Sequence, residues 1–167
     1  KVWANRILES DRRRYSEELE RLRGQLEAAV HAHRMQFDIE FKALSEIWAK
    51  VAAVRATIGQ VRPTGDVVDP AEDPAVRIER RFRAFSQAFG ELVQAVDDQT
   101  PFYTEAIYQE LSQAIQVARR EEIGMRVHRP EEPDWGENGR RNSAEFVERA
   151  ETISRLIRER LASLRVA

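Results

Sequence analysis

Residues 37–61 read FDIEFKALSEIWAKVAAVRATIGQV, and this stretch decides the fold. Its large apolar side chains recur at steps of three or four, at Phe37, Phe41, Leu44, Trp48, Val51, Val54, Ile58 and Val61. Side chains spaced in this way share one face of an α-helix. We therefore predict a helix that buries this face against other helices.

The residues upstream of this stretch indicate that the same helix begins far earlier, at about Val2. No proline occurs between Val2 and Val61, and a thinner apolar stripe marks the upstream half, at Tyr15, Leu19, Leu22, Leu26 and Ala29. Continued as a heptad repeat, that stripe meets polar residues from His33 onward, so the seam fades or shifts phase near residues 33–37. The upstream half is typical of a coiled coil.

Two polar segments that contain proline and glycine divide the rest of the chain. Residues 62–74 (RPTGDVVDPAEDP) and 129–142 (RPEEPDWGENGRRN) are predicted to be exposed loops. The helical period returns over 74–99, 104–124 and 143–165, which predicts three shorter helices.

Capping signals stand at the starts of these three helices. Asp73 before Pro74 combines a side-chain acceptor with a residue whose φ is preset for a helix. Thr104 before Glu105 offers a second acceptor. Asn142-Ser143-Ala144-Glu145 is typical of a capping box, so we expect the last helix to begin near residue 143.

The unequal helix lengths predict the architecture. A helix of about 60 residues spans about 90 Å, whereas helices of about 20 to 27 residues span roughly 30 to 40 Å. The short helices therefore cover only the half of the long helix that carries the strong stripe. We predict an all-α fold in which the second half of the long N-terminal helix packs with three shorter helices as an up-down bundle, residues 35–167. Residues 1–34 are predicted to project as a coiled-coil stalk.

Composition excludes several classes of protein. The chain has 167 residues, a formal net charge of -2 and no cysteine. Disulfides and thiolate metal sites are therefore ruled out, and no overall positive field draws in nucleic acid, which we do not expect as a partner. Strand patterns and hairpin turns are missing from the sequence.

No motif in the sequence predicts an enzyme or a cofactor site. His31 and His33 stand two residues apart, so on a helix they point in nearly opposite directions and cannot share a metal ion. The segment GQVRPTG at 59–65 lacks the lysine and hydroxyl residue of a phosphate-binding loop. We predict no catalytic residues, no metal and no cofactor.

Two surfaces are instead candidates for contacts with other proteins. The upstream stripe at Tyr15, Leu19, Leu22 and Leu26 predicts self-association into a homo-oligomer, either parallel or antiparallel. Trp135, in the second polar loop, and Tyr103, in a turn, are candidate contacts for a different protein. They support an alternative hypothesis, a soluble adaptor or regulator that binds a protein or an RNA through the bundle.

Three segments carry a resemblance. They are SEELERLRGQLEAAVHAHRMQFDIEFKALSEIWAKVAAVR at 16–55, PFYTEAIYQELSQAI at 101–115 and ERAETISRLIRERLASLRV at 148–166. Together they make the chain similar to a loose class of uncharacterised bacterial proteins with one N-terminal membrane span, a charged coiled-coil stalk and a small helical bundle. The resemblance implies a topology and no chemistry. It also implies a span before Lys1, which is missing from this sequence.

The first hypothesis is therefore a non-enzymatic scaffold or interaction protein tethered at a bacterial inner membrane. The excess of basic residues within residues 1–14 favours the cytoplasmic face, because cytoplasmic segments beside a membrane span are enriched in lysine and arginine. A cytoplasmic location without a membrane anchor is the alternative.

Overall fold

The computed structural model describes residues 2–62 and 69–166, with side chains described over 13–62 and 69–164. The helices are α1 (Val2–Val61), α2 (Pro74–Gln99), α3 (Glu105–Val127) and α4 (Trp135–Val166), with a 3₁₀ turn, η1, at Thr100–Phe102. Contacts divide the chain into unit 1, Lys1–Ile39, and unit 2, Glu40–Ala167.

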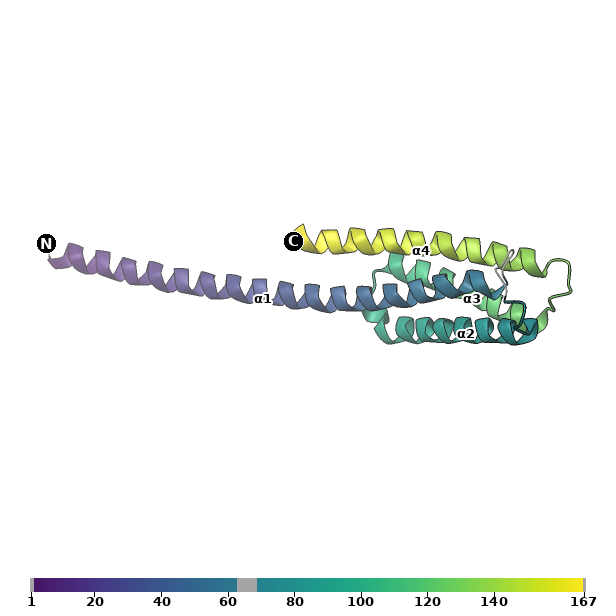
Figure 1. Ribbon diagram of the computed structural model, residues 1–167. Coiled ribbons are helices and arrows are strands. Elements are labelled where there is room, and N and C mark those ends of the chain that lie inside the picture. Colours follow the sequence, from purple (N-terminus) through teal and green to yellow (C-terminus); the bar gives the residue numbers. More distant parts are fainter. Residues whose placement is uncertain (1, 63–68, 167) are drawn as a thin grey trace. The chain divides into compact units, whose positions relative to one another are not determined.

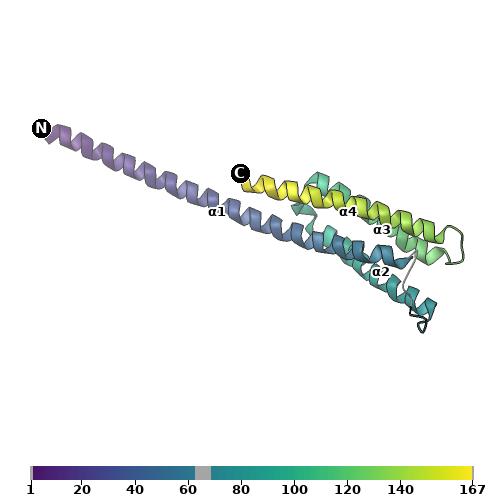
Figure 2. The ribbon, with the colours of Figure 1, turned by 45° about the horizontal axis from the view of Figure 1, so that its top comes forward.

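The predicted all-α class is confirmed, and so is the packing of the long first helix against three shorter ones. The described residues contain no strand. Figures 1 and 2 both show α2, α3 and α4 running alongside the second half of α1. Projection of residues 1–34 as a stalk stays a prediction.

Polar contacts give the direction of each helix in unit 2. Along each pair of contacting helices, the residue numbers rise in one helix and fall in the other. The pairs are Glu46–Gln99 and Lys50–Glu91 between α1 and α2, Glu40–Arg160 and Arg55–Glu151 between α1 and α4, and Glu110–Arg149 and Arg120–Glu145 between α3 and α4. The helices of each of these three pairs are therefore antiparallel, as an up-down bundle requires.

Two of the predicted caps are present. The Asp73 side chain accepts a hydrogen bond from the Ala75 amide at 2.8 Å, and Pro74 stands at the start of α2. The Thr104 hydroxyl accepts from the amide of Ile107 at 3.4 Å at the start of α3. Each cap satisfies an amide that has no partner within its own helix.

The core of unit 2 follows the predicted stripes, with one exception. Leu44, Val51 and Val54 of α1 are fully buried among apolar residues of the other helices, which include Phe85, Phe89, Leu92, Ile107, Leu111, Phe146 and Ile153. Phe41, predicted within the buried stripe, is instead 46% exposed. Ile47 is fully buried although it lies beside the predicted stripe, so the buried face of α1 is wider than one row of side chains.

The prediction for the start of the last helix is wrong. The expected loop at 129–142 is shorter, because α4 begins at Trp135 and Asn142 lies inside it. Asn142 is buried. Its side chain donates a hydrogen bond to Glu121 of α3 instead of capping the amides at the start of a helix. A tertiary partner has replaced the local capping role.

The prediction of an exposed loop at 62–74 is also wrong at its first residue, and residues 63–68 lie outside the described part of the chain. Arg62 directly follows α1 and is only 4% exposed. It is buried because its guanidinium finds a carboxylate partner inside unit 2.

Candidate interaction surface and buried ion-pair cluster

Unit 1 presents an exposed row of large apolar side chains along α1. Every described residue from Arg13 to Ala32 is exposed. The exposed fractions of the row are 68% for Tyr15, 56% for Leu19, 51% for Leu22, 65% for Leu26 and 51% for Val30. The sequence analysis named the first four of these residues as candidates for self-association, and the structure places all four on the surface of unit 1.

Charged residues flank this row on both sides. Glu18 precedes Leu19, and Arg23 follows Leu22, and both charged residues are exposed. A narrow apolar seam with charges beside it is the pattern by which helices of a coiled coil recognise each other.

Unit 2 contains a buried ion pair that sequence reasoning missed. The exposed fractions of the Arg62 and Glu121 side chains are 1% and 0%. Arg62 donates from Nε to Oε1 of Glu121 at 2.7 Å and from Nη2 to Oε2 at 3.2 Å. Its Nη1 donates to the backbone carbonyl of Trp135 at 2.9 Å, and Asn142 Nδ2 donates to Glu121 Oε2 at 2.8 Å. We call these four residues the Arg62 cluster.

The Arg62 cluster joins three helices at one end of unit 2. Its members come from the residue after α1, from α3 and from the first turns of α4. Both carboxylate oxygens of Glu121 accept hydrogen bonds, so the pair is fully engaged by the protein. A buried pair of this kind fixes positions, and removing one partner leaves an uncompensated charge.

Two glycines make room for the Arg62 side chain. A Cβ added at Gly139 would lie 2.7 Å from Arg62 Cβ and 2.8 Å from Arg62 Cδ. A Cβ added at Gly124 would lie 2.2 Å from Arg62 Nη2. Gly139, which was predicted to lie in a loop, therefore serves close packing inside α4, as Gly124 does inside α3.

Trp135 and Tyr103, the two candidate partner contacts, are both half-buried. The Arg62 guanidinium lies over the Trp135 ring, 5.4 Å from its centroid, and the buried indole Nε1 has no hydrogen-bond acceptor among the described residues. The Tyr103 hydroxyl lies 3.3 Å from both the Ala95 carbonyl and Gln99 Oε1. Burial, helped by the charge of Glu46, raises the pKa of Tyr103 above its ordinary value. Trp135 therefore contacts Arg62, whereas Tyr103 contacts the end of α2.

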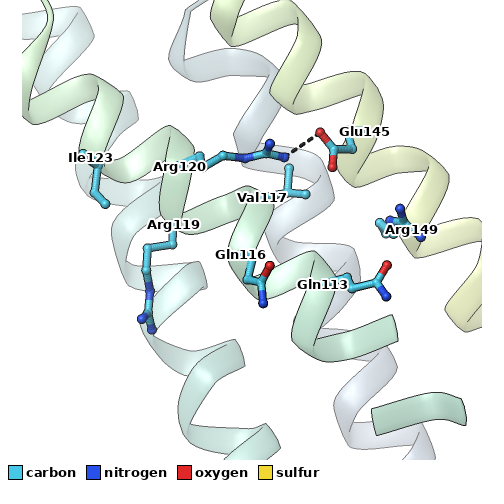
Figure 3. A pocket seen from close by; sticks show the side chains of 8 residues that line it. All are labelled: Gln113, Gln116, Val117, Arg119, Arg120, Ile123, Glu145 and Arg149. Atoms are coloured by element: carbon cyan, nitrogen blue, oxygen red, sulfur yellow. Dashed lines mark hydrogen bonds and ion pairs between the residues drawn. The ribbon is translucent and has the colours of Figure 1, made fainter. Parts of the chain in front are cut away.

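A groove between α3 and α4 has a volume of about 680 Å³ (Figure 3). Arg120 points across it to Glu145 at 2.5 Å, and Arg149 pairs with Glu110 at 3.3 Å. Two of the three lining arginines are therefore offset by carboxylates, and the groove carries little net positive charge. This arrangement does not favour a phosphate ligand.

The described residues hold no cluster of three or more side chains able to bind a metal ion. His128 pairs with Glu132 at 2.7 Å on the surface. A hydrogen bond from the Arg129 amide, with a smaller contribution from His128, lowers the pKa of Glu132. No helix within the described ranges has a long and apolar enough segment to cross a membrane.

The chain matches no protein-family model, no curated protein and no solved structure. The resemblance to membrane-anchored bacterial proteins with a stalk and a bundle therefore stays a prediction. The geometry of the two units is the basis for a functional interpretation.

Proposed function

We propose that this protein is a non-enzymatic scaffold or interaction protein that self-associates through residues 15–30 of α1 and carries unit 2 as a folded helical head. The observation that carries the proposal is the exposed row from Tyr15 to Val30. Apolar side chains repeating along one face of a helix stabilise it only when another surface covers them.

The energy available from covering this row supports association. Burying a leucine side chain that was exposed contributes about 1.5–3 kcal/mol. Leu19, Leu22 and Leu26 are each more than half exposed, so pairing two helices removes six such side chains from water, three from each copy. A gain of this size is comparable with the cost of bringing two chains together.

Unit 2 supports the second half of the proposal, a stable head without chemistry of its own. Its buried acid, Glu121, is engaged by Arg62 and Asn142 and is not poised to exchange a proton with a substrate. An acid that catalyses needs access to the reacting group.

Attachment to the cytoplasmic face of a bacterial inner membrane is a further part of the proposal. It rests on the basic residues within 1–14 and on the resemblance described above. Fractionation of cells that express the intact gene tests it. Recovery in the membrane pellet, resistant to high salt, supports attachment, and recovery in the soluble fraction contradicts it.

Light scattering over a concentration series tests self-association. We expect the chain, 19.4 kDa as a monomer, to show a multiple of that mass. The triple variant Leu19→Ser, Leu22→Ser, Leu26→Ser should revert to the monomer mass. A matched control places the same change at exposed apolar residues of unit 2, Val76→Ser, Ile123→Ser and Val127→Ser, and should keep the oligomer.

Two results contradict self-association through this row. One is a wild-type mass of 19.4 kDa at every concentration. The other is an oligomer that survives the triple leucine variant, since association would then lie elsewhere.

A further inference from the structure

We infer that two copies of the chain pair along residues 15–29 in parallel and in register, with Glu18 of each copy beside Arg23 of the other. This inference rests on the proposed function, because it names the occupant of the exposed row as a second copy of the chain. It adds the orientation and the number of strands.

The seam positions follow from the spacing. Tyr15, Leu19, Leu22, Leu26 and Ala29 are separated by four, three, four and three residues, which is the alternation of d and a positions in a heptad repeat. Glu18 then stands directly before an a position, at g, and Arg23 directly after a d position, at e. Residues at g and e flank the seam and meet the partner helix.

The assignment is compatible with the glycine of this segment. Gly24 occupies the f position, opposite the seam, and a Cβ added there would meet no atom within 4 Å. Glycine is tolerated at f because no packing against a partner is lost there.

Parallel pairing places opposite charges together. In a parallel two-stranded coiled coil, a g residue meets the e residue five positions later on the partner helix. Glu18 of one copy thus meets Arg23 of the other, and symmetry repeats the pair. Each exposed pair contributes modestly, but the two together favour one orientation.

Antiparallel pairing loses these pairs. In antiparallel coiled coils g faces g and e faces e. The register with Leu19 opposite Leu22 of the second copy puts Glu18 near Gln25 and Arg23 near Ser16. Shifting by one heptad in either direction brings Arg23 beside Arg23, or Glu18 beside Glu18. Within residues 15–29, none of these three registers forms an opposite-charge pair.

The seam also has a limit. From Leu26 a heptad repeat proceeds to Ala29, whereas the next large apolar residue is Val30, one position later. Tyr15, Leu26, Phe37 and Trp48 are spaced by 11 residues, a period that favours a right-handed supercoil rather than the left-handed supercoil of a heptad repeat. The two-stranded seam therefore covers residues 15–29.

Disulfide trapping tests orientation in the intact chain, which has no cysteine of its own. Tyr15→Cys and Leu26→Cys are oxidised separately and as a mixture. A parallel, in-register pair cross-links each variant with itself. An antiparallel pair with Leu19 opposite Leu22 cross-links them only in the mixture, because residue 15 then lies opposite residue 26. An antiparallel pair shifted by one heptad cross-links neither variant, and either result would overturn the inference.

Charge exchange gives a second, independent test by measuring the dissociation constant of the dimer. Glu18→Arg places arginine beside arginine in a parallel pair, and we expect a dissociation constant about fivefold higher or more. The double variant Glu18→Arg, Arg23→Glu restores the pairs and should recover the wild-type value. Equal dissociation constants for the wild type and Glu18→Arg would contradict the parallel pairing.

The outcomes separate this inference from the proposed function. A monomer in light scattering removes both. A dimer that cross-links only in the mixture keeps self-association and removes the parallel orientation. A trimer or tetramer mass keeps self-association and overturns the two-stranded pairing.

Discussion

Two parts of α1 carry apolar stripes of the same period and differ in what covers them. Residues 15–30 present one row of side chains, all more than half exposed. Residues 43–61 present a wider face, because Ala43 and Ile47 are buried in addition to the row that begins at Leu44. A wide face packs against several neighbours, as it does in unit 2, whereas a single row fits one partner helix. The width of a stripe thus predicts how many helices surround it.

The largest expected effect compares two arginines, one at the end of α1 and one on its exposed half. Arg62→Met leaves Glu121 buried and uncompensated, and we expect it to lower the free energy of unfolding by about 3–5 kcal/mol. Arg21→Met, on the exposed part of unit 1, should change it by less than about 0.5 kcal/mol. Urea denaturation followed by tryptophan fluorescence, with Trp3→Phe in every variant so that only Trp48 and Trp135 contribute, reports on unit 2. Similar losses for both variants would break the comparison.

Two leucines of α1 give the next contrast. Leu44→Ala removes a fully buried side chain, with an expected loss of about 2–5 kcal/mol in the same denaturation experiment. Leu22→Ala should leave that value within about 0.5 kcal/mol and should instead weaken self-association in light scattering. A large loss of unit 2 stability from Leu22→Ala would mean that the exposed row supports the bundle directly.

Two glycines sharpen the comparison, because replacing each by alanine is expected to change stability in opposite directions. Gly139→Ala forces a Cβ against the Arg62 stem next to its backbone, and we expect a destabilisation of about 1–3 kcal/mol. Gly24→Ala meets no neighbouring atom and should stabilise its helix by about 1 kcal/mol. Thermal unfolding followed by circular dichroism measures both. A stabilising Gly139→Ala would mean that Arg62 adjusts freely.

The smallest expected effect is the pH dependence of the stabilisation by a surface ion pair in unit 2. Lys50 Nζ lies 2.8 Å from Glu91 Oε2, and this hydrogen bond, with a second one from Gln87, holds the pKa of Glu91 below its ordinary value. The stabilisation by this pair is therefore present at neutral pH and is lost as pH falls through the lowered pKa. Lys50→Met should raise the pKa of Glu91 in an NMR titration. The Lys42 ammonium lies 3.9 Å from Glu46, so the control variant Lys42→Met should leave the pKa of Glu91 unchanged.

Much of the fold was predictable, because local signals agree with the tertiary structure at most places. The caps at Asp73 and Thr104 are such places, since each side chain bonds a nearby amide in the chain. The stripes of α2 and of α1 from Leu44 onward are others, because their apolar periods continue through buried residues such as Leu44 and Phe85.

The Arg62 cluster was not predicted, because local sequence rules assign Arg62 and Trp135 to loops and Asn142 to a cap. One signal was present. Glu121 continues the buried positions Leu111, Ala114 and Ala118 of α3 in steps of three and four, so an acid falls on a core face. Asn142 likewise lies one helical turn, four residues, before the buried Phe146. A polar residue on a buried stripe predicts a buried partner, but the sequence does not indicate that the partner is Arg62, on another helix.

The Arg62 cluster has a consequence for how quickly the bundle forms and comes apart. Arg62 meets Glu121 and Trp135 across sequence separations of 59 and 73 residues. Contacts this distant close long loops, and we expect them to form late in folding and to be largely absent from the folding transition state. Interactions absent from the transition state slow unfolding and leave the folding rate nearly unchanged. We therefore expect loss of the cluster to shorten the lifetime of folded unit 2 more than it slows its assembly.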